Sequence, residues 1–170
     1  MGSSAAEISS ARVLNNLAVT DELKDVGSGT GQTHTHDDLD SAAFSFTASS
    51  DPPGKYYSAQ TLALVAGVAT IDLTSLPGLQ AAIDGTGLKL QFLRIRGEAD
   101  GSNAVLNIAP GAVNPYSLFG AANDIDYPAA CTKPFTFEFD EGTEDVDATH
   151  KNIALAGTGT DSFFVEMILG

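Results

Sequence analysis

The chain has no tryptophan, a single cysteine and few basic residues. With Cys131 alone, no intrachain disulfide can form, and the sequence gives no support for secretion. Eight lysines and arginines against 22 acidic residues give a formal net charge of −14, which argues against binding to a nucleic-acid backbone. No run approaches the ~20 apolar residues of a membrane span, and residues 1–10 lack the features of a signal peptide. These absences predict a soluble, acidic protein made in the cytoplasm.

What is present favours a globular β protein. Of the 170 residues, 43% are hydrophobic, and 17 glycines with seven prolines predict many turns. The clearest strands are "FTFEFD" at 135–140 and "SFFVEMIL" at 162–169, whose alternation predicts that Phe137 and Val165 are buried. Short strands with frequent turn signals and no βαβ rhythm predict an all-β fold, an antiparallel β-sandwich with jelly-roll-like topology.

Other strand-like segments are less regular. Residues 62–74 fit either two short strands around Gly67 or one strand with a bulge there. In "LKLQFLRIR" at 88–96 the alternation slips, so we expect a bulge near Phe92 or burial on both faces. A turn or two of helix is suggested only at 74–83.

The first 55 residues differ in composition from the rest of the chain, because they are rich in Ser, Ala, Thr and Asp. Apolar residues at 8, 11, 14 and 17 fit one short helix, and Phe44 with Phe46 fits a short strand. We therefore expect an extended N-terminal arm over 1–55 and a β-sandwich domain over 56–170. If neighbouring molecules hold the arm, its removal should leave a folded sandwich.

Several motifs suggest chemistry but fit simpler roles. The Gly-Thr-Gly at 85–87 lacks the third glycine of a dinucleotide fingerprint and the lysine of a phosphate loop, so a turn is expected. The acidic segment 140–150 lacks the calcium-loop pattern and favours a solvated loop. Arg94 and Arg96 share a strand face and could clamp a partner's carboxylate, although an intramolecular salt bridge is more ordinary. No catalytic constellation is visible, and we expect a protein that is not an enzyme.

The segment "GQTHTHDDLD" at 31–40 contains two of the three histidines. In an extended chain His34 and His36 project to the same side, which makes a chelate but not a complete site. Only His150 remains as a further imidazole, so a hydrolase site is short of ligands. Three chains meeting at a threefold axis would supply six nitrogens, which suit iron, zinc or nickel. The alternative is an ordinary polar segment with solvated histidines.

Two resemblances bear on these alternatives. Gly31 and Thr33–Asp38 resemble segments of bacteriophage tail-fibre and spike proteins, in which His-x-His pairs from three chains ligate an iron on the fibre axis. Separately, "VATIDLTSLPG", "DGTGLKLQFLRIRG", "NIAPGAVNPYSLFGA" and "LAGTGTDSFFVEMILG" resemble a family of small proteins from phage and prophage structural modules. That second resemblance spans residues 66–170 and implies a virion component with a β-sandwich domain and no known activity.

Taken with the composition, these resemblances predict a non-enzymatic structural component of a phage virion, located in the virion as a decoration, fibre-base or spike protein. The expected partners are other copies of the chain, in a homotrimer, and capsid or tail proteins contacted through residues 1–55. The alternative is a carbohydrate- or receptor-binding module. Its candidate aromatic residues are Tyr56, Tyr57, Tyr116 and Tyr127.

Overall fold

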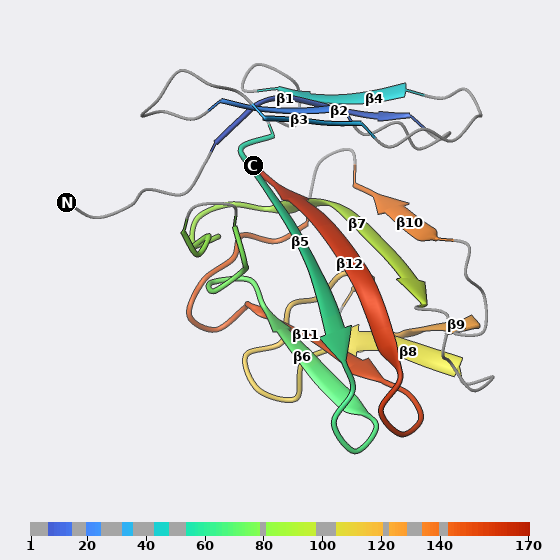
Figure 1. The fold of residues 1–170 in the computed structure, drawn as a ribbon. Coiled ribbons are helices and arrows are strands. Elements are labelled where there is room, and N and C mark those ends of the chain that lie inside the picture. The colour runs from blue at the N-terminus through green and yellow to red at the C-terminus, as the bar shows by residue number, and fades with distance from the viewer. Residues whose placement is uncertain are drawn as a thin grey trace.

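Three four-stranded antiparallel sheets make up the described part of the chain (Figure 1). The structure is a computed structural model that describes residues 7–14, 20–24, 32–35, 43–47, 54–78, 81–97, 105–120, 123–128, 134–139 and 143–170. Sheet A has the order β3-β2-β1-β4, sheet B the order β10-β7-β12-β5 and sheet C the order β6-β11-β8-β9. The strands are β1 (Glu7–Leu14), β2 (Thr20–Lys24), β3 (Gln32–Thr35), β4 (Ala43–Thr47), β5 (Tyr56–Ala63), β6 (Val68–Asp72), β7 (Leu90–Gly97), β8 (Val105–Pro110), β9 (Ile125–Pro128), β10 (Phe135–Glu138), β11 (Asn152–Ala156) and β12 (Ser162–Leu169).

Sheets B and C form the sandwich, and their pairing is nested. The first strand, β5, pairs with the last, β12; β6 pairs with β11, β7 with β10 and β8 with β9. Further pairs of β12 with β7 and β11 with β8 complete the two sheets. A long hairpin rolled up across two sheets gives this order, which is the jelly-roll topology. The structure therefore confirms the all-β fold and the antiparallel sandwich, and it gives the sandwich a jelly-roll strand order.

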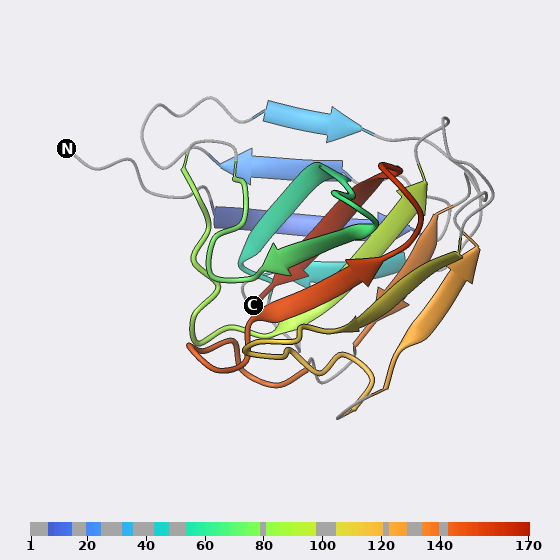
Figure 2. The same ribbon diagram turned by 90° about the horizontal axis from the view of Figure 1, so that it is seen from below.

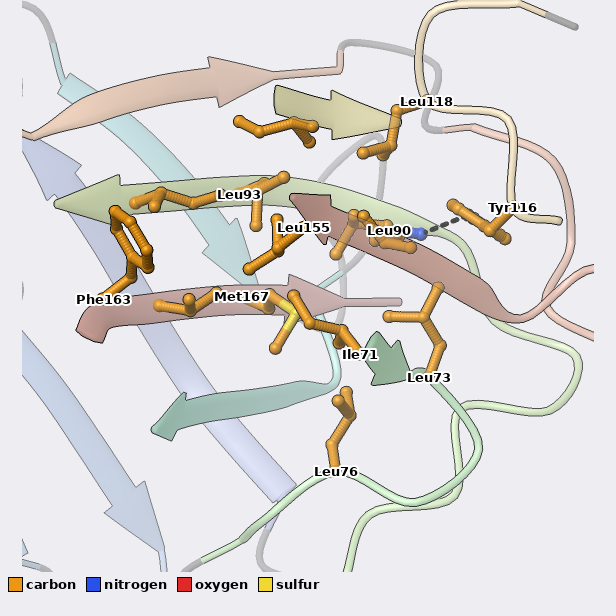
Figure 3. Packing of buried hydrophobic residues seen from close by; sticks show 14 of the residues in the cluster. Ile71, Leu73, Leu76, Leu90, Leu93, Tyr116, Leu118, Leu155, Phe163 and Met167 are labelled. Carbon is orange, nitrogen blue, oxygen red and sulfur yellow. Dashed lines mark hydrogen bonds between the residues drawn. The ribbon is translucent and has the colours of Figure 1, made fainter. Parts of the chain in front are cut away.

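The core lies between sheets B and C (Figure 3). From sheet B, alternate residues of β12 such as Phe163, Val165 and Met167 face sheet C and are fully buried. The prediction for Val165 is confirmed. Phe137 is only half-buried because β10 is the edge strand of sheet B, and its ring packs 4.4 Å from that of Phe135.

Strand β7 carries both features expected from its slipped alternation. The register with β12 shifts so that Ile168 pairs with Phe92 and Leu169 pairs with Leu90. Gln91 is the extra residue of this bulge, and all six residues from Leu90 to Ile95 are buried. Burial on both faces means that another part of the chain covers sheet B on the side away from the core.

Residues 62–74 contain the end of β5 and all of β6, with a two-residue turn at Ala66 and Gly67 between them. Val65 and Val68 pair across the turn, and Ala66 and Gly67 have φ angles of 52° and 84°. A Cβ on Gly67 would lie 2.8 Å from the carbonyl oxygen of Gly157, so only glycine fits there. The turn carries the chain from sheet B to sheet C.

Both helix predictions were wrong. Glu7–Leu14 is a strand paired with β2 and β4, and two flanking partners outweigh the sparse helical spacing of its apolar residues. Within 74–83, Leu76 and Ile83 instead pair in an isolated β-bridge. Pro77 and Gly78 disfavour a helix there.

The N-terminal segment, expected as an extended arm, contributes a layer of its own. Its strands form sheet A, which lies beyond sheet B on the side away from sheet C (Figures 1 and 2). The described elements thus stack as sheet C, sheet B and sheet A.

Candidate functional site

A buried polar network lies on the face of sheet B that points away from the core. Arg94 on β7 and Glu166 on β12 are directly opposite each other in register. The Arg94 Nη1 atom donates to Glu166 Oε2 at 2.7 Å, and the Tyr57 hydroxyl on β5 donates to Glu166 Oε1 at 2.7 Å. Glu166 is 2% exposed and Arg94 is 9% exposed. The carboxylate of Glu166 therefore links the three adjacent strands β5, β12 and β7.

The electrostatics of this network are those of a buried ion pair. Burial lowers the pKa of Arg94, while the charge of Glu166 opposes that shift. The Nε atom of Arg94 is buried without a hydrogen-bond partner, so the guanidinium is incompletely satisfied. Arg96 is exposed and its guanidinium lies 4.8 Å from the centroid of the Phe164 ring. The two arginines thus have separate contacts, and Arg94 forms the ordinary intramolecular salt bridge.

The acidic loop 143–150 is organised around Asp147. Asp147 Oδ1 accepts from the backbone N–H of Thr149 at 2.6 Å, its hydroxyl at 2.8 Å and the backbone N–H of His150 at 2.8 Å. The bonds from Thr149 hold the pKa of Asp147 well below its usual range. The imidazole Nδ1 of His150 lies 3.2 Å from the same carboxylate. Asp147 therefore stabilises the turn in which it lies, and this turn belongs to an exposed loop.

The same turn chemistry occurs at two other places. Asp72 Oδ1 accepts from the backbone N–H and hydroxyl of Thr74 at 2.9 and 2.6 Å, and Asp84 does so from Thr86 at 3.0 and 2.6 Å. These turns could have been predicted from the Asp-x-Thr motif, which occurs at 72–74, 84–86 and 147–149. The Gly-Thr-Gly at 85–87 belongs to one of them, as a turn and not a phosphate loop.

Tyr116 anchors the acidic loop from within the core. Its hydroxyl donates to the carbonyl of Glu144 at 2.7 Å, accepts from the backbone N–H of Leu90 at 3.0 Å, and contacts the hydroxyl of Thr143 (Figure 3 draws the Leu90 bond). Burial raises the pKa of Tyr116. Tyr116 and Tyr127 are both buried, so neither is a surface platform for a sugar ring. Tyr56 and Tyr57 are half-buried.

Of the two predicted metal ligands, His34 lies in sheet A. His34 lies in β3, which is an outer strand of that sheet, and its register partner in β2 is Asp21. His36 and Cys131 lie outside the described residues. Over the residues that the structure does describe, no group of three or more His, Cys, Asp or Glu side chains could hold a metal ion. The threefold site therefore stays a prediction.

Comparisons with known proteins add no assignment. No protein-family model matches the chain, and no curated protein is similar enough to match it. None of the described residues belongs to a helix with the length and hydrophobicity that a membrane crossing requires.

Proposed function

We propose that the protein is a non-enzymatic structural component of a bacteriophage virion, acting as a decoration, fibre-base or spike protein. The observation that supports this most is the jelly-roll sandwich, because this architecture recurs as the building unit of viral capsids. The polar groups are also used within the fold: Glu166 joins three strands, and Asp147 closes its own turn. Because these polar side chains stabilise the fold, they support a structural role in assembly.

The proposed mechanism is association of identical chains with one another and with capsid or tail proteins. In this proposal, residues 1–55 make the contacts with neighbours in the virion. Sheet A supports that role by its position, since it is an outer layer of the molecule (Figure 1). Repeated weak contacts on a symmetric particle add up to stable attachment.

The self-association is proposed to be a homotrimer with a transition metal on its axis. His34 and His36 of three chains would supply six neutral imidazole nitrogens, a ligand set that suits iron, zinc or nickel. The outer position of β3 in sheet A supports this, because a neighbouring chain can approach a strand at the edge of a sheet.

Replacing both His34 and His36 with alanine should remove one metal ion per three chains and weaken the trimer while leaving the sandwich folded. Acidification below the histidine pKa of ~6.5 should have the same effect, because only neutral imidazole binds the metal. Native mass spectrometry with elemental analysis measures both quantities. His150→Ala is the matched control, since that imidazole contacts Asp147 in an exposed loop. Equal metal content in the double variant and the wild-type protein would contradict the site.

The carbohydrate-binding alternative has less support from the side chains. Two of its four candidate tyrosines are in the core, and sugar platforms need exposed rings. A glycan array separates the two functions: the assembly proposal expects no specific glycan, whereas a reproducible ligand class would favour the binding module.

A further inference from the structure

We draw no further inference here: the strongest candidate, the cluster of half-buried aromatic rings of Phe119, Phe135 and Phe137 beside the edge strand β10 of the sandwich, is an apolar surface patch, and nothing in the described part of the chain shows what covers it.

Discussion

Replacing Glu166 with alanine should lower the free energy of unfolding by about 3–5 kcal/mol, the usual cost of removing one partner from a buried ion pair. The large effect follows from the position of this carboxylate, which receives hydrogen bonds from Arg94 and Tyr57 on both neighbouring strands. Without it, the guanidinium of Arg94 stays buried with no opposite charge. Urea denaturation followed by circular dichroism measures the loss.

Three further variants identify the cause. Tyr57→Phe removes the hydrogen bond to Glu166 Oε1 and should cost about 1.5–3 kcal/mol. Changing Arg94 and Glu166 together to methionine removes both charges and should recover most of the stability. Lys89→Ala removes an exposed pair in which Nζ lies 3.9 Å from Asp145, which should cost no more than about 1 kcal/mol. A loss under ~1 kcal/mol for Glu166→Ala would show that the network does not hold the sheet.

Removing residues 1–53 should leave a chain that no longer unfolds cooperatively. Phe92 and Ile168 point away from the core yet are each only 1% exposed, next to the Arg94–Glu166 pair. Sheet A lies on that side of sheet B (Figures 1 and 2). Uncovering two large apolar side chains costs about 1.5–3 kcal/mol each, and the ion pair would become hydrated as well. Such a loss is comparable with the 5–15 kcal/mol that stabilises a typical domain.

The comparison uses the fragment 54–170 alone and mixed with a separate fragment 1–53. Thermal unfolding followed by near-ultraviolet circular dichroism measures cooperativity. If sheet A covers sheet B, adding the N-terminal fragment should restore a sharp transition. A fragment 54–170 that melts cooperatively at the temperature of the full chain would mean that the N-terminal segment is an independent arm, as its composition alone suggests.

The sandwich could be predicted from sequence because its central strands alternate clearly. Val165 lies in the middle of such a strand and is fully buried. The slipped alternation near Phe92 predicted a bulge or burial on both faces, and the structure has both. The nested pairing of β5 with β12 and of β6 with β11 could not be derived from the sequence, because strand partners 80 or more residues apart share no local sequence pattern.

What could not be predicted depends on contacts between distant segments. Ile8, Ala11 and Leu14 have a helical spacing, yet pairing partners on both sides make this segment a strand. Glu166 lies on the face of β12 opposite Val165, and its burial depends on Arg94 and Tyr57, which come from distant strands. Tyr116 gave no sequence signal for its role, since the groups that its hydroxyl contacts come from β7 and the 143–150 loop.

The claim that this chain is a virion component is tested most directly on purified phage particles from a host that encodes it. The particles are banded on a density gradient, their proteins are quantified by mass spectrometry, and an antibody with a gold label locates the chain by electron microscopy. The proposal predicts a fixed copy number per particle that is a multiple of three, with gold at one defined virion site. Particles that lack the chain, while it accumulates in the unassembled fraction of the same lysate, would contradict it.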